Sequence, residues 1–106
     1  MSAEAFKQQL AVLSAEYRTA LPQRLARLAD LRAALHGQDQ ASALNEMLRE
    51  LHSLAGSAKT FGLAGLGEQA RAAELFLDPF CRDGALFPEN FARLDQLLEA
   101  VGRNAA

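Results

Sequence analysis

The apolar residues of the N-terminal third recur every three or four positions, which is the spacing of one face of an α-helix. Between positions 6 and 35 this stripe consists of Phe6, Leu10, Leu13, Tyr17, Leu21, Leu25, Leu28, Leu31 and Leu35. Ser2 is a favourable N-cap residue, and His36-Gly37 follows the last apolar position. Pro22 lacks an N–H for residue 18, so we expect a break or kink near residues 18–21. The pattern predicts an N-terminal helix followed by the first helix of the main fold.

Three further amphipathic segments follow. The first should begin between residues 39 and 42 and run to about residue 61, where Gly62 stops it; its apolar positions are Leu44, Met47, Leu48, Leu51, Ala55 and Ala58. The second should span residues 63–77 and end at Asp78-Pro79. Residues 80–87 read as a loop or a frayed turn, and Pro88 suits the first turn of a last helix.

Four main helices with short connections predict an all-α fold, an antiparallel four-helix bundle with the additional N-terminal helix as a cover. The length of 106 residues corresponds to a single domain, residues 1–106. Leucine and alanine are abundant, whereas tryptophan is absent and tyrosine occurs once, which also favours helix over strand.

Composition narrows the class of protein. With 11 basic and 13 acidic residues the formal net charge is −2, too balanced for binding to nucleic acid or an acidic membrane by charge alone. The N-terminus lacks the features of a signal peptide, and no apolar run approaches the ~18 residues of a membrane span. Cys81 is the only cysteine, which excludes an intramolecular disulfide. We expect a monomeric, cytoplasmic protein with no nucleic-acid or membrane partner.

His52 is the first candidate for chemistry. On the helix expected to end near residue 61 it lies at the edge of the buried face, with Gly56 one turn and Lys59 two turns further along the same strip. Glycine inside a helix costs about 1 kcal/mol relative to alanine, so the exposed backbone beside the imidazole favours close approach by a partner. Two ordinary alternatives stay open. His52 can be a solvated flank residue, and Gly56 can serve close packing between helices.

Glu74 is the second candidate. His52 precedes Gly62 by ten positions and Glu74 follows it by twelve, so at ~1.5 Å per residue two antiparallel helices place them at nearly the same height. A carboxylate beside an imidazole can keep one ring nitrogen protonated and leave the other as an oriented nucleophile. A Glu–His pair is also a common surface contact, so this placement alone does not decide the function.

The segment HSLAGSAKTFGL, residues 52–63, resembles the signature of histidine phosphotransfer (HPt) domains, most closely the phosphoacceptor domain of chemotaxis-type histidine kinases. The family pattern is roughly H-x-[LI]-K-G-x-[AS]-x-x-x-G, and the matching positions are His52, Leu54, Gly56, Ala58 and Gly62. The resemblance implies an elongated four-helix bundle with His52 as phosphoacceptor and Glu74 orienting its ring. The chain departs from the pattern at Ala55, where the family usually has lysine, and Lys59 is the candidate replacement for that charge.

The implied function is that of a phosphocarrier and not of an enzyme in its own right. His52 would carry a phosphoryl group between a sensor or hybrid histidine kinase, or a receiver aspartate, and the receiver domain of a response regulator. The surface facing that partner would consist of Leu48, Ala55, Gly56 and Lys59. No cofactor is expected on this chain, since the resemblance assigns Mg²⁺ to the receiver.

Two other functions remain open from the sequence. Because Ala55 replaces the usual lysine, the chain can also be a helical adaptor or degenerate HPt fold that binds a receiver without carrying phosphate. The third possibility is a dimerising helical bundle with no role in a phosphorelay. The remaining reactive residue types have ordinary interpretations: His36 as a C-terminal helix cap and Cys81 as a small apolar filler. Two histidines without clustered carboxylates predict no metal site.

Overall fold

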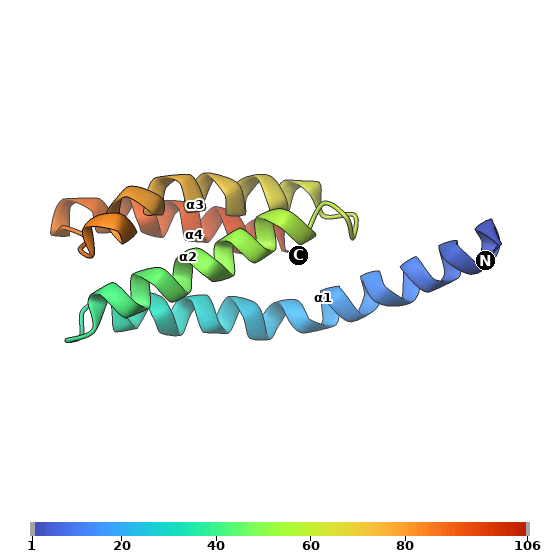
Figure 1. Cartoon of the computed structure of the whole chain (residues 1–106), viewed down its shortest axis with the longest axis horizontal. Coiled ribbons are helices and arrows are strands. Elements are labelled where there is room, and N and C mark those ends of the chain that lie inside the picture. Colours follow the sequence, from blue (N-terminus) through green and yellow to red (C-terminus); the bar gives the residue numbers. More distant parts are fainter. Residues whose placement is uncertain (1, 106) are drawn as a thin grey trace.

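Helices form nearly the whole of the computed structural model, which describes residues 2–105 (Figure 1). Within that range there are four α-helices and one short 3₁₀ turn: α1 (Ala3–Ala34), α2 (Gln40–Ser57), α3 (Ala64–Asp83), η1 (Pro88–Asn90) and α4 (Phe91–Asn104). The all-α prediction is therefore confirmed. Residues 1 and 106, the ends of the expected domain, lie outside the described residues.

Successive helices run in opposite directions, and α2 packs against both α1 and α3, while α3 also packs on α4 (Figure 1). The apolar faces of all four meet in one core. Its fully buried large side chains are Leu35, Leu44, Met47, Leu51, Leu54, Leu66, Leu77, Leu94 and Val101. In the part of the chain that is described, no helix is long and apolar enough to cross a membrane.

The separate N-terminal helix is not confirmed, because α1 is continuous from Ala3 to Ala34 with Pro22 inside it. Pro22 removes one backbone hydrogen bond, and α1 bends near this region without breaking, so the expected kink is present and the expected break is not (Figure 1). The first half of α1 projects beyond the bundle, and Phe6 and Leu13 are exposed there. It does not act as a cover. Further along α1, Tyr17 hydrogen-bonds Ser57 Oγ of α2 at 2.8 Å.

Pro79 does not end α3, so the predicted end at Asp78-Pro79 is wrong. A proline inside a helix leaves the carbonyl four residues earlier without its bond, and that residue, Leu75, lies on the exposed face where water can replace it. The helix ends one turn later. Gly84, in the left-handed region with φ 77°, donates its N–H to the Phe80 carbonyl at 2.8 Å.

The end of α2 lies at Ser57, earlier than the predicted end near residue 61. Gly62, with φ 82°, allows the chain to reverse, and the N–H of Leu63 reaches the Ala58 carbonyl at 2.9 Å. Lys59 therefore lies in a turn after the helix. The buried stripe of α2 is completed by Leu54, which has no exposed surface, whereas the predicted core positions Leu48 and Ala55 are only half-buried.

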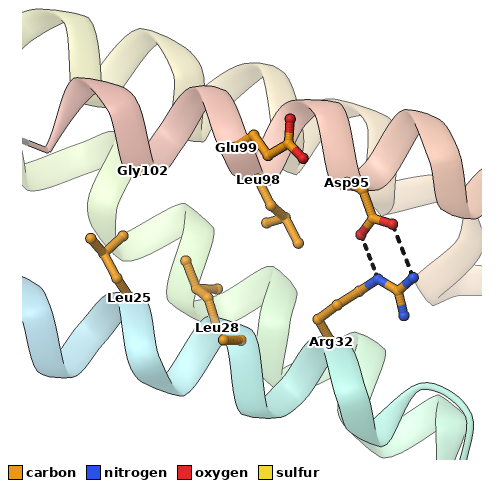
Figure 2. A pocket seen from close by; sticks show the side chains of 8 residues that line it. Leu25, Leu28, Arg32, Asp95, Leu98, Glu99 and Gly102 are labelled. Carbon is orange, nitrogen blue, oxygen red and sulfur yellow. Dashed lines mark hydrogen bonds and ion pairs between the residues drawn. The ribbon is translucent and has the colours of Figure 1, made fainter.

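Helices α1 and α4 face each other along one side of the bundle (Figure 2). A groove of about 380 Å³ lies there, with Leu25 and Leu28 on α1 facing Leu98 on α4 (Figure 2). Arg32 closes one end of it, donating from Nε and Nη2 to the two carboxylate oxygens of Asp95 at 2.6 and 3.1 Å. This bidentate ion pair joins α1 and α4.

Candidate functional site

His52 lies on the outer flank of α2 at its boundary with α3. The neighbouring positions Leu51 and Leu54 are fully buried, and this register turns the imidazole outward. Its side chain is 72% exposed, and Nδ1 lies 2.5 Å from Oε2 of Glu74. The structure thus brings together the two side chains that the antiparallel geometry predicted to meet.

Glu74 is the one charged residue in the buried set of the described chain, with 9% of its surface exposed. Its second oxygen, Oε1, accepts a hydrogen bond from Arg71 Nη1 at 2.8 Å. Burial by itself raises the pKa of the Glu74 carboxyl, but the hydrogen bonds from Arg71 and His52, together with their charges, outweigh burial and bring the pKa below its usual value. Glu74 is therefore an ionised carboxylate at neutral pH.

An ionised carboxylate only accepts hydrogen bonds, so the contact requires the proton of the His52 ring to be on Nδ1. In the neutral ring the lone pair is then on Nε2, the nitrogen that Glu74 does not contact. The arrangement can present an oriented nitrogen nucleophile to a partner in solution.

Arg71 is the residue of this site that sequence reasoning missed. It lies one turn before Glu74 on α3, and its side chain is 56% exposed. The available signal was the three-residue spacing to Glu74, which places both on one side of a helix. That spacing identifies an ordinary helical ion pair, and only the packing of α3 on α2 shows that the same carboxylate also holds His52.

Lys59 lies near the site but outside the hydrogen-bonded cluster. It is exposed, and among the described residues it forms no ion pair. It contributes to the wall of a shallow groove of about 320 Å³ on the seam between α2 and α3. The groove is lined by Ala55, Lys59, Ala64, Gly67, Glu68 and Arg71. Lys59 and Arg71 are the two basic residues of this groove, and Glu68 is its acidic residue.

The two glycines near the site have different surroundings. A Cβ added at Gly56 would meet no atom within 4 Å, so its surface is open. A Cβ at Gly67 on α3 would lie 3.6 Å from the Ala55 carbonyl and 3.7 Å from the Ala58 side chain. Close packing of α2 and α3 therefore occurs at Gly67. The packing explanation for Gly56 is not supported.

On the side of α2 away from α3, an ionic cluster fixes the helix to α1. Arg24 of α1 donates to Glu50 Oε1 at 2.6 Å and to Ser53 Oγ at 2.8 Å. Tyr17 of α1 also stacks on Phe61 with ring centroids 4.7 Å apart. Because Glu50 and Ser53 lie on either side of His52 along α2, the Arg24 contacts hold the backbone that presents the imidazole.

The other reactive side chains lie elsewhere. His36 follows the end of α1, stacks on Phe91 and approaches Arg32 at 3.0 Å. Cys81 is half-buried and donates to the Leu44 carbonyl at 3.3 Å; burial first, and the charge of Asp78 second, raise the pKa of its thiol to about 11. An inert filler role fits Cys81. Across residues 2–105 there is no group of three His, Cys, Asp or Glu side chains arranged to hold a metal.

The comparisons with known proteins agree with this geometry. The family model described as Hpt domain matches residues 4–104, nearly the whole chain. No curated protein and no solved structure matches the sequence. Hpt domains act as phosphocarriers in histidine phosphotransfer, the chemistry of two-component phosphorelays. By this match the chain belongs to the Hpt domain family.

Proposed function

We propose that this protein carries a phosphoryl group on Nε2 of His52 between two partners of a phosphorelay. The donor is the aspartyl phosphate of a receiver domain or a sensor or hybrid histidine kinase, and the acceptor is the receiver aspartate of a response regulator. The observation that carries the proposal is the exposed His52 ring, bonded through Nδ1 to a carboxylate at 2.5 Å. The opposite nitrogen is left for the partner.

The transfer step needs no redox partner and no proton from solvent. The Nε2 lone pair attacks phosphorus, the N–P bond forms, and the P–O bond to the aspartate breaks with its electron pair leaving on the carboxylate. The ring then carries a positive charge with its proton still on Nδ1, and Glu74 stabilises this charge. Transfer to the next receiver reverses the same steps.

The partner supplies the rest of the chemistry in this proposal. Mg²⁺ and the electrophilic stabilisation of the phosphoryl oxygens belong to the receiver, and this chain acts as carrier without a cofactor. Its residues 1–106 form a single domain that works as a cytoplasmic monomer. Lys59 adds positive charge near the incoming phosphoryl group.

The receiver docks on the strip of α2 that contains His52 and Gly56, flanked by Leu48, Ala55 and Lys59. Open space at Gly56 supports this placement, as do the half-buried side chains of Leu48 and Ala55, which offer apolar surface beside the imidazole. Figure 1 shows that α2 and α3 form one flank of the elongated bundle, and a partner can approach that flank without displacing another helix.

The alternative is an adaptor that binds a receiver without carrying phosphate. It is favoured by Ala55, because this position lacks the lysine usual in the family. A dimerising bundle without any relay role would bind no receiver at all.

One experiment separates these functions. The protein is incubated with a receiver carrying ³²P-labelled aspartyl phosphate, and the expected result is acid-labile, base-stable label on this chain. His52→Gln should remove the label and His36→Gln, the matched exposed histidine, should retain it. Receiver binding without label would establish the adaptor. Label that survives in His52→Gln would overturn the assignment.

A further inference from the structure

The site contains a positive charge that the family pattern does not place there. At position 55, where a lysine is usual, the chain has alanine, and Lys59 lies in the turn beyond the end of α2. Arg71 instead reaches the site from α3 and bonds the carboxylate that holds His52. We propose that Arg71 is a positioning residue for phosphotransfer, which fixes Glu74 against His52 and supplies from α3 the charge that Ala55 does not supply from α2. This inference rests on the proposed role of His52.

The geometry gives each carboxylate oxygen of Glu74 its own partner. Oε1 accepts from Arg71 at 2.8 Å, and Oε2 bonds the His52 ring at 2.5 Å. Two bonds in different directions determine the rotation of a carboxylate, whereas a single bond leaves it free to turn. Since Glu74 is almost fully buried, few water molecules can replace a lost partner. Arg71 thereby sets the orientation of the oxygen that orients the imidazole.

Arg71 also has capacity left for the phosphoryl group. Its guanidinium has several N–H donors, of which one is used by Glu74, and the side chain is 56% exposed beside the groove on the α2–α3 seam. Guanidinium groups bind phosphate oxygens through paired hydrogen bonds. When His52 is phosphorylated, the negative charge arrives at a site whose carboxylate already bonds this guanidinium.

The test compares Arg71→Gln and Arg71→Lys with Arg82→Gln. Arg82 is a matched control because it is an exposed arginine on the same helix with an ion pair to a nearby acid, Asp78, at 3.6 Å. Three quantities are measured on the full chain: the transfer rate from a phosphorylated receiver, the Glu74 carboxyl titration by ¹³C NMR, and the tautomer of His52 by ¹⁵N NMR. Lys59→Gln is measured in the same way, so that the effect of removing Arg71 can be compared with that of removing the other basic residue of the groove.

In Arg71→Gln we expect transfer to slow by about tenfold, because the variant loses one charge-assisted hydrogen bond to Glu74. The pKa of the Glu74 carboxyl should rise, because burial remains while the Arg71 hydrogen bond and charge are removed. The Nδ1–H tautomer of His52 should become less dominant. Arg71→Lys should recover part of the rate, and Arg82→Gln should match the wild type in all three quantities.

Wild-type transfer and an unchanged Glu74 titration in Arg71→Gln would overturn this inference alone and leave the phosphocarrier function intact. A slowed rate accompanied by an unchanged His52 tautomer and a reduced melting temperature would also overturn it, since it would show a structural role. Absence of label on His52 in the wild-type protein would instead refute the proposed function, and with it the role of Arg71.

Discussion

Substitutions at Gly56 test whether open space beside His52 exists for a docking partner. Gly56 lies in the last turn of α2, and a Cβ built there would meet no atom within 4 Å. Alanine at this position therefore causes no clash and removes the entropy cost of glycine in a helix. Gly56→Ala should stabilise the protein by about 0.5–1 kcal/mol.

That free energy is large enough to measure. For a domain of this size about 1 kcal/mol shifts the melting temperature by about 4–8 °C, so Gly56→Ala should melt about 2–8 °C higher than the wild type. Gly56→Arg should retain a melting temperature close to that of the wild type, because the long side chain extends into solvent. In the transfer assay, however, arginine one turn from His52 should occlude the imidazole and slow transfer strongly.

Gly102→Arg is the matched control, because a Cβ at Gly102 also meets no atom within 4 Å, and this residue lies on α4 in the groove facing α1. It should leave transfer unchanged. Circular dichroism melts and ³²P transfer are measured on the same preparations of all three variants. A destabilised Gly56→Ala, or a Gly56→Arg that transfers at the wild-type rate, would refute the docking explanation.

Three further predictions concern Glu74 and Cys81. Glu74→Ala should slow transfer and change the free energy of unfolding by no more than about 1 kcal/mol. The change is small because both partners of Glu74, His52 and Arg71, are mostly exposed and regain hydrogen bonds to water. A globally unfolded variant would contradict this prediction. The pKa of Glu74 is lower in the folded protein than its unfolded value of 4.5. Its contribution to stability should therefore be present above pH 4.5 and be lost as the pH falls through the folded pKa. Acid unfolding of the wild type and of Glu74→Ala measures this difference. Cys81, with a thiol pKa of about 11 against an ordinary 9.0, should react with iodoacetamide at pH 8 about 100-fold more slowly in the folded protein than in denaturant. Equal rates in the two states would show that the thiol is not protected.

Local sequence patterns determined most of the helices. Their apolar positions repeat every three or four residues, and left-handed glycines at positions 62 and 84 mark the turns because other residues adopt that conformation at a cost. Proline was a weaker guide. Pro22 and Pro79 both lie inside helices, since the loss of one hydrogen bond is tolerated where packing on the rest of the helix is extensive.

The pairing of His52 with Glu74 could be predicted for a geometric reason. Two antiparallel helices joined by a tight turn place residues at equal distance from that turn side by side, so counting along the chain was sufficient. The motif around His52 depends on short spacings within one helix. For the same reason it could be recognised without knowledge of the other helices.

Only the tertiary structure decided the features that depend on contacts between helices. The stripe of α1 continues over Phe6, Leu10 and Leu13, yet α2 is too short to reach these positions, and periodicity within one helix does not show where its neighbour ends. Gly56 and Gly67 are alike in sequence, and the opposing backbone alone distinguishes the open position from the packed one. Arg71 is part of the site because the buried carboxylate of Glu74 lies between Arg71 and His52 and bonds both. The packing of α3 against α2 sets this direction of the Glu74 side chain.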